Sequence, residues 1–214
     1  TNAMIPLQKN TFLHEHETKK ALADFILSAD RLSMGEKCRA FEEQFAKKQG
    51  RKEAVLFNSG SSANLAIMQA LKNLGILREG DKIGFSAITW STSTMPIIQM
   101  GMVLVPLDCD PATLNTMCRN IEERMNTTAM RGIFITNALG FTGDLGSIRD
   151  LCQKKNMVLI EDNCESLGTE FPSGKAGNFG IAASFSFFVA HHLSTSEGGM
   201  ACTDDEELAQ MLRI

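Results

Sequence analysis

Short apolar runs alternate with stretches of helical periodicity along most of this chain, and that alternation constrains its fold more than any other feature. Such runs predict buried strands, and apolar residues three and four positions apart predict the helices between them. Strands that alternate with helices are typical of an α/β sheet with crossover helices. We expect strands at 54–57, 82–86, 103–107, 132–136, 157–160, 182–187 and 199–203. Helices are expected at 17–27, 37–48, 62–74, 95–100, 121–125 and 148–155, and from 205 onward.

The length and composition narrow the classes of function. The chain has 214 residues, which suffices for one large domain or for one domain and part of another. A net charge of −4 without a basic cluster argues against nucleic acid as a partner. No apolar run is long enough to span a bilayer, so we expect no membrane partner. The scattered cysteines lack a CxxC pair and favour reduced thiols in the cytoplasm.

The ends of the chain suggest its organisation. We interpret residues 1–3, which precede Met4, as an expression scar. Residues 4–36 are expected to form an N-terminal segment, and 37–214 to form the main domain. The chain stops at Ile214 within an apparent helix, which suggests that it is one domain of a larger protein.

Residues 58–64, Asn-Ser-Gly-Ser-Ser-Ala-Asn, follow one predicted strand and open a helix. Gly60 lets the backbone approach a ligand, and a helix N-terminus offers free N–H groups and a positive dipole end to a phosphate. The hydroxyls of Ser61 and Ser62 add donors. The alternative is a plain helix N-cap without a ligand.

Two further segments carry polar or aromatic groups beside predicted strands. Asp162 follows a buried strand, at the sheet edge where open α/β folds bind ligands. The alternative is an aspartate that only caps the next turn. Trp90, the single tryptophan, is flanked by Thr89 and Ser91, which favours the wall of a site over a position in the core.

Residues 184–199 contain Phe-Ser-Phe, with Ser186 at its centre, then His191, His192 and a Glu-Gly-Gly run. Histidine moves protons near neutral pH but does not form a stable imine. Adjacent histidines also suggest a metal, but no other His, Cys or Asp cluster has ligand spacing, so we expect no metal site in this chain.

Together these motifs resemble the sugar aminotransferases that use pyridoxal phosphate (PLP), the DegT/DnrJ/EryC1/StrS family. They occur in the family's order between about residue 34 and residue 214. In that family a lysine links covalently to the cofactor, whereas here His191 takes its position and no lysine follows Lys175. The resemblance implies PLP-dependent transferase fold type I, a three-layer α/β/α domain with a mostly parallel, seven-stranded sheet, and a smaller C-terminal domain that this chain lacks.

The resemblance also implies roles for individual residues. Trp90 would stack on the cofactor ring, and Asp162 would keep the pyridine nitrogen protonated. Glu165 stands where the family usually has glutamine, and it too would contact the cofactor. The residues implied to bind PLP are Gly60, Ser61, Ser62, Trp90, Asp162, Glu165 and Ser186.

The histidine places the chain near the family's 3-dehydrases of nucleotide-linked 4-keto-6-deoxy sugars, which serve dideoxysugar and O-antigen (lipopolysaccharide) biosynthesis. The resemblance then implies a cofactor used as pyridoxamine phosphate (PMP), with His191 as the general base for loss of the C3 hydroxyl. It implies a nucleotide-linked sugar and a second copy of the chain, in a homodimer, as partners. Two alternatives stay open: an aminotransferase whose lysine is supplied differently, and a non-catalytic cofactor-binding fragment.

Cys164 leaves a further choice open within that branch. One group of these enzymes regenerates PMP with glutamate and acts on GDP-linked sugars. Another acts on CDP-linked sugars, carries an iron–sulfur cluster and takes electrons from a separate reductase. Cys164 resembles the first cluster ligand of the second group, so a 2Fe-2S cluster in the full-length protein and a reductase partner are both possible under this resemblance.

Overall fold

The computed structural model describes residues 10–214, and the scar predicted at 1–3 lies outside the described residues. Within this range no helix is both long and apolar enough to cross a bilayer. The helices are α1 (Glu15–Ser28), α2 (Glu36–Gln49), α3 (Gly60–Asn73), α4 (Ser91–Gln99), α5 (Cys118–Met125), α6 (Leu145–Lys154) and α7 (Glu206–Leu212), with a 3₁₀ turn, η1, at Ala138–Gly140. The strands are β1 (Glu53–Phe57), β2 (Lys82–Ser86), β3 (Val103–Leu107), β4 (Gly132–Thr136), β5 (Val158–Asp162), β6 (Glu170–Phe171), β7 (Gly174–Lys175), β8 (Ala182–Ser186) and β9 (Gly199–Thr203).

Seven of these strands form one sheet in the order β1-β9-β8-β5-β4-β2-β3. The pairs β2–β3, β2–β4, β4–β5 and β5–β8 are parallel, whereas β9 runs antiparallel to both β1 and β8. The expected mostly parallel, seven-stranded sheet is therefore confirmed. Because β9 reverses direction between its neighbours, β1 runs the same way as β8, and the carboxyl ends of β1, β4, β5 and β8 lie at one edge.

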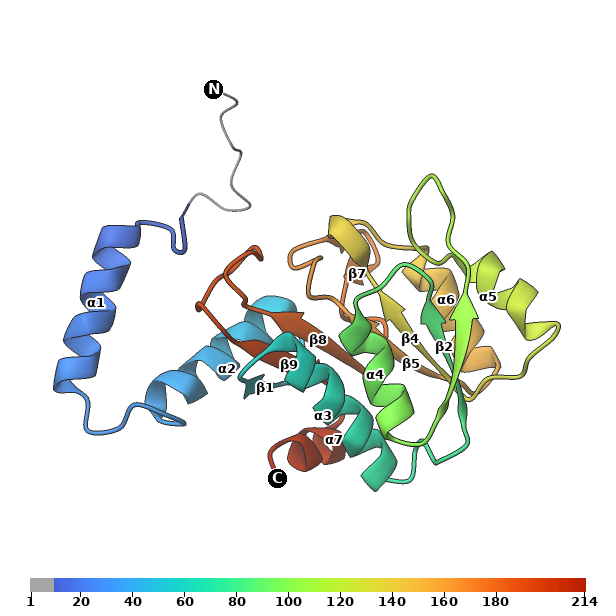
Figure 1. Ribbon diagram of the computed structural model, residues 1–214, viewed down its shortest axis with the longest axis horizontal. Helices are drawn as coiled ribbons and strands as arrows, with labels where there is room; N and C mark the ends of the chain where they lie inside the picture. The colour runs from blue at the N-terminus through green and yellow to red at the C-terminus, as the bar shows by residue number, and fades with distance from the viewer. Residues whose placement is uncertain (1–9) are drawn as a thin grey trace.

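Helices cover both faces of the sheet, which gives the three expected layers (Figure 1). On one face α3, α4 and α7 pack through Ile67, Ile97 and Leu208 against strand residues such as Ile160. On the other face α5 and α6 pack on the neighbouring residue Leu159 and its cluster, and α2 packs on β8 and β9. Consecutive strand residues point to opposite faces, so the central strands are apolar on both sides. Helix α1 has no buried residue and extends away from the sheet in Figure 1.

The structure corrects some of the predicted boundaries. Helix α4 begins at Ser91, four residues before the predicted start at 95, because a run of short hydroxyl residues forms its first turn and Trp90 is its N-cap. Such residues compete with helix by bonding to nearby backbone, so sequence patterns assign them to loops. The starts predicted at 121 and 148 are also late, since α5 begins at Cys118 and α6 at Leu145. The hairpin β6–β7 and turn η1 were not predicted.

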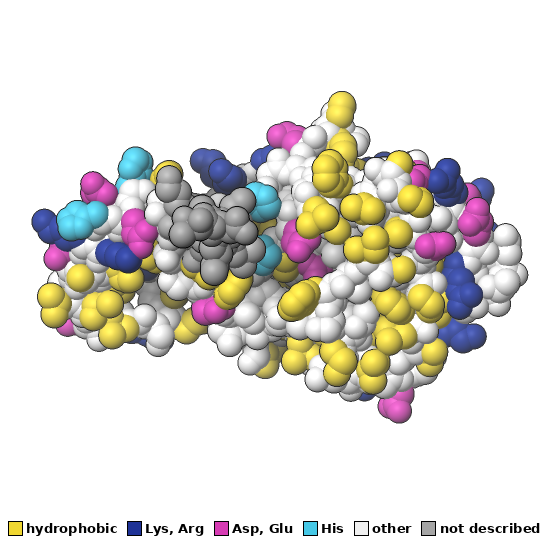
Figure 2. All heavy atoms as spheres, turned by 45° about the horizontal axis from the view of Figure 1, so that its top comes forward, with side chains coloured by type: hydrophobic (Ala, Val, Ile, Leu, Met, Phe, Trp, Pro, Cys, Tyr) yellow, Lys and Arg dark blue, Asp and Glu magenta, His cyan; other side chains and the backbone are white. Residues whose placement is uncertain are grey.

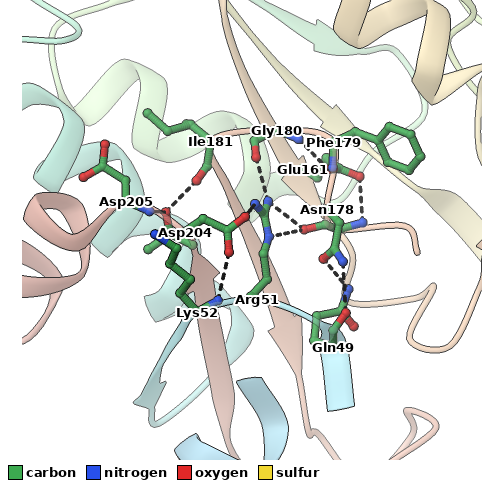
Figure 3. Close-up of polar contacts among 12 residues, drawn as sticks. Gln49, Arg51, Lys52, Glu161, Asn178, Phe179, Gly180, Ile181, Asp204 and Asp205 are labelled. Carbon is green, nitrogen blue, oxygen red and sulfur yellow. Dashed lines mark hydrogen bonds and ion pairs between the residues drawn. The ribbon is translucent and has the colours of Figure 1, made fainter. Parts of the chain in front are cut away.

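Two buried charged residues hold the segment 177–180 that leads into β8 (Figure 3). Glu161, which is fully buried in β5, accepts hydrogen bonds at 2.7–2.8 Å from the backbone N–H groups of Gly177, Phe179 and Gly180. Arg51 donates to the carbonyl oxygens of Gly177 and Gly180 from the other side, and it pairs with Asp204 at 2.8 Å. One carboxylate therefore satisfies three backbone donors of this segment, and one guanidinium satisfies two of its carbonyl acceptors.

We expect Glu161→Gln to destabilise the fold strongly. A glutamine keeps one acceptor oxygen but turns its amide donor toward the N–H donors that the second oxygen now satisfies. Leaving buried donors unpaired and removing a buried charge that they stabilise costs about 3 kcal/mol. Urea unfolding measures this loss. Glu43→Gln is the matched control, because Glu43 is exposed in α2 and should change stability by less than about 0.5 kcal/mol. Equal midpoints for the two variants would contradict this account of the segment.

Candidate functional site

The polar residues singled out in the sequence converge at the carboxyl edge of the sheet. β5 ends at Asp162 and β8 ends at Ser186, while β1 leads directly into α3 at Gly60. Helix α4, entered from Trp90, begins beside them and packs against α3. In open α/β sheets this edge is where ligands bind. In Figure 2 the top of Figure 1, toward which the arrows of the central strands point, is turned toward the viewer. The surface there carries apolar side chains interspersed with charged ones.

The loop after β1 leads into the N-terminus of α3, where the backbone at Gly60 packs closely against other segments. Ser59 caps α3 by accepting a hydrogen bond from the Ser62 N–H at 3.1 Å. A Cβ at Gly60 would lie 2.8 Å from the Cys164 Sγ and 2.8 Å from the Ser186 Cβ. The structure thus brings Gly60, Cys164 and Ser186 into contact, although they are far apart in the sequence. The helix N-cap that the sequence offered as an alternative to a ligand site is therefore present. It does not exclude a ligand, because other N–H groups in the first turn of α3 have no partner within the helix.

Asp162 is the buried carboxylate of this site, with 4% of its surface exposed. One oxygen, Oδ2, accepts from the Asn64 Nδ2 at 2.9 Å and from the Ser93 Oγ at 2.6 Å. The other, Oδ1, accepts from the backbone N–H of Cys164 at 3.1 Å. Asp162 lies at the end of β5, as its sequence context predicts, whereas the contacts from Asn64 and Ser93 were not predicted. Only their positions in the first turns of the two helices that flank the site could have pointed to them.

Trp90 and Glu165 lie nearer the surface. Trp90 is 71% exposed, which excludes the alternative of a core residue. Glu165 accepts a hydrogen bond at its Oε2 from the backbone N–H of Leu139, at 2.8 Å. Leu139 has a φ of 58°, a left-handed conformation that is costly for a leucine, and it is 62% exposed in turn η1. Glu165 therefore holds a strained turn at the rim of the site.

His191 lies in the loop between β8 and β9, half-buried beside Phe188, whose backbone carbonyl accepts from the His191 N–H at 2.9 Å. Burial lowers the pKa of the His191 imidazole below the ordinary 6.5, and His192 acts in the same direction. The carboxylates of Glu165 and Asp162 oppose that shift, so both lie close enough to act on the ring. At pH 7 the imidazole is neutral, and one of its ring nitrogens is free to accept a proton.

Cys164 lies beside Asp162 at this edge of the sheet. Burial raises the pKa of its thiol well above the usual range, and the charge of Asp162 adds to that shift. The thiol is therefore protonated at neutral pH unless a bound metal displaces its proton. Among residues 10–214 no three His, Cys, Asp or Glu side chains gather as a metal site requires.

The donors fit a phosphorylated aromatic ligand with a ring nitrogen. The small residues at the start of α3 leave backbone N–H groups for a phosphate, and Ser186 lies against them. Asp162 presents a buried acceptor to a protonated nitrogen, and Trp90 offers an exposed ring for stacking. His191 adds a group that exchanges protons. The arrangement therefore suits a ligand that carries both an anionic group and a cationic ring, next to an imidazole that can exchange protons.

The model of the DegT/DnrJ/EryC1/StrS aminotransferase family matches residues 14–214. A GDP-4-keto-6-deoxy-D-mannose 3-dehydratase of Escherichia coli O55:H7 is 38% identical over 189 residues, which are 87% of this chain and 48% of that protein. A dTDP-4-dehydro-2,6-dideoxy-D-glucose 3-dehydratase of Saccharopolyspora spinosa is 31% identical over 211 residues, 97% of this chain and 45% of that protein. An E. coli GDP-4-keto-6-deoxy-D-mannose-3-dehydratase solved with bound hydrated PLP matches with a TM-score of 0.90 at 36% identity, covering 98% of this chain and 54% of that one. The chain spans about half the length of the curated relatives it matches.

We expect the charge of Glu165 to tune the pKa of His191. Glu165→Gln removes a carboxylate that raises this pKa, so the pKa should fall further. His192→Asn removes a neighbouring ring that lowers it, so the pKa should rise. NMR titration of the His191 ring protons measures both changes, and Glu207→Gln, on the exposed side of α7, is the control. A pKa for His191 that moves in the same direction in both variants would contradict this electrostatic arrangement.

Proposed function

The chain belongs to the DegT/DnrJ/EryC1/StrS aminotransferase family, and we propose that it is the cofactor-binding domain of a PLP/PMP-dependent 3-dehydratase. Its substrate would be a nucleotide-linked 4-keto-6-deoxyhexose, which loses the C3 hydroxyl. The observation that carries this proposal is His191, an imidazole that is neutral at pH 7 and stands at the family's lysine position beside the buried Asp162. Two relatives that are 3-dehydratases by name, at 38% and 31% identity, support it.

The cofactor would be held by the residues that converge at the carboxyl edge. The phosphate would lie at the N-terminus of α3, bound by the backbone of Gly60, the hydroxyls of Ser61 and Ser62, and Ser186. That cradle has no room for a Cβ at Gly60, which fits a loop shaped around a small ligand group.

The ring would be held at one face and at its nitrogen. Asp162 would accept from the pyridine nitrogen, and Trp90 would cover one face of the ring. Glu165, with Oε2 on the Leu139 N–H, has its other oxygen, Oε1, available for the cofactor.

His191 would move the proton. When bound, PMP would supply an amine that joins the C4 ketone of the sugar and a methylene C–H bond whose electrons expel the C3 hydroxyl, while the protonated ring buffers the charge. A ring nitrogen of His191 would accept the methylene proton, and a neutral imidazole with a lowered pKa is in the correct state for this at pH 7. A lysine at this position would compete for the cofactor by binding it covalently, which histidine does not do.

The lysines of the chain do not favour the aminotransferase alternative. Lys175, the last of them, belongs to the hairpin β6–β7, and its Nζ donates to the backbone carbonyl of Lys48 in α2. Lys72, in the last turn of α3, donates to the carbonyl of Met100. Neither of these two lysines lies at the carboxyl edge. The aminotransferase would then need a lysine from elsewhere.

Three finer points belong to the proposal: a homodimer, a 2Fe-2S cluster in the full-length protein, and a separate reductase partner. The family resemblance supports a dimer. Cys164 supports a cluster only weakly, because a single cysteine matches a cluster that needs several ligands. The GDP-linked relative at 38% identity favours the branch that regenerates PMP with glutamate.

We expect the purified protein to retain PLP without a covalent link. After desalting, absorbance should show bound cofactor, and borohydride reduction should leave the protein mass unchanged, because histidine forms no reducible bond with the aldehyde. His191→Lys is the matched control and should gain the mass of a phosphopyridoxyl group. A stoichiometric adduct on a lysine of the unaltered protein would support the aminotransferase instead.

A further inference from the structure

The proposed function leaves the two side chains that hold Asp162 without a role. They come from different helices: Asn64 from the first turns of α3 and Ser93 from the first turn of α4. Both donate to the same oxygen, Oδ2, at 2.9 and 2.6 Å. Asn64 is 1% exposed and Ser93 is fully buried. The carboxylate is therefore fixed by two helices that also border the proposed phosphate and ring positions.

All three groups that bond to the Asp162 carboxylate are donors. An ionised carboxylate only accepts hydrogen bonds, whereas a protonated one has to donate one. Because the Asn64 amide, the Ser93 hydroxyl and the Cys164 N–H all donate here, the arrangement suits the ionised form. Hydrogen bonds to a charged group are also shorter and stronger than those between neutral groups, which agrees with the 2.6 Å from Ser93.

The orientation of the Asn64 side-chain amide is not explained by stability alone. Its Oδ1 is buried and has no hydrogen-bond partner among the described residues. An unpaired buried acceptor usually costs about 1–3 kcal/mol. Rotating the amide would not remove this cost, because it would turn Oδ1 toward the carboxylate and lose the bond from Nδ2. The orientation of Asn64 is therefore dictated by Asp162, at the expense of its own acceptor.

We propose that Asn64 and Ser93 are positioning residues that hold Asp162 ionised and aimed at the ring nitrogen of the cofactor. The inference rests on the proposed function, since it needs a bound pyridine ring. By occupying Oδ2 with two donors, the pair disfavours transfer of the ring proton to Asp162. The proton then stays on the ring, where it makes the ring an electron acceptor.

The test compares PLP with 1-deazapyridoxal phosphate, which has the same phosphate and shape but a carbon in place of the ring nitrogen. Quenching of Trp90, the only tryptophan, reports binding at the site. We expect the unaltered protein to bind PLP at least about tenfold more tightly than the analogue. In Ser93→Ala and in Asn64→Ala, the preference should fall by about threefold to tenfold, because only PLP binding depends on Asp162. Ser166→Ala, which removes another buried hydroxyl that does not contact Asp162, should keep the full preference.

The possible outcomes distinguish the proposed role of Asp162 from the positioning role of Asn64 and Ser93. If the unaltered protein binds no PLP, or binds both ligands equally, the proposed role of Asp162 fails and the inference fails with it. If it prefers PLP and both variants keep that preference, only the positioning role is overturned. Equal weakening of both ligands in the two variants shows a general structural effect and also overturns it. A reduced preference in one or both variants, with Ser166→Ala unchanged, supports the inference.

Discussion

Two adjacent carboxylates at the end of β5 organise this domain. The pleat of a strand sends consecutive side chains to opposite faces, so Glu161 and Asp162 act on different parts of the molecule. Glu161 binds three backbone N–H groups of the segment before β8. Asp162 joins α3 to α4 through Asn64 and Ser93. Because β8 in turn carries Ser186 and leads to the loop with His191, the first carboxylate places this strand, and the second links the two helices that border the site.

Burial sets the direction of the pKa shifts of His191 and Cys164, two titratable residues at this edge. An exposed histidine would be partly protonated near neutral pH, whereas burial lowers the pKa of His191 and leaves it able to accept a proton. Burial also raises the pKa of the Cys164 thiol, which is therefore protonated at neutral pH in the absence of a metal.

The sequence predicted the sheet and much of the site, but not the contacts that hold the site together. The strands were recognisable because β4, β5 and β8 are buried on both faces and appear as apolar runs. Asp162 was recognisable because it ends such a run. Ser93 was missed, since it sits among hydroxyl residues that resemble a loop and lies 69 residues from its partner. The role of Glu161 depends on a segment that only the tertiary structure brings within hydrogen-bond distance.

The central claim is that His191 transfers a proton in a C3 deoxygenation. The most direct measurement is product analysis after the purified protein is incubated with PMP, glutamate and a nucleotide-linked 4-keto-6-deoxyhexose. The account predicts a sugar without its C3 oxygen from the unaltered protein, and a rate about 10²–10⁴-fold lower in His191→Asn, with PMP binding nearly unchanged. A 4-amino sugar as the main product, or undiminished deoxygenation in the asparagine variant, would contradict it.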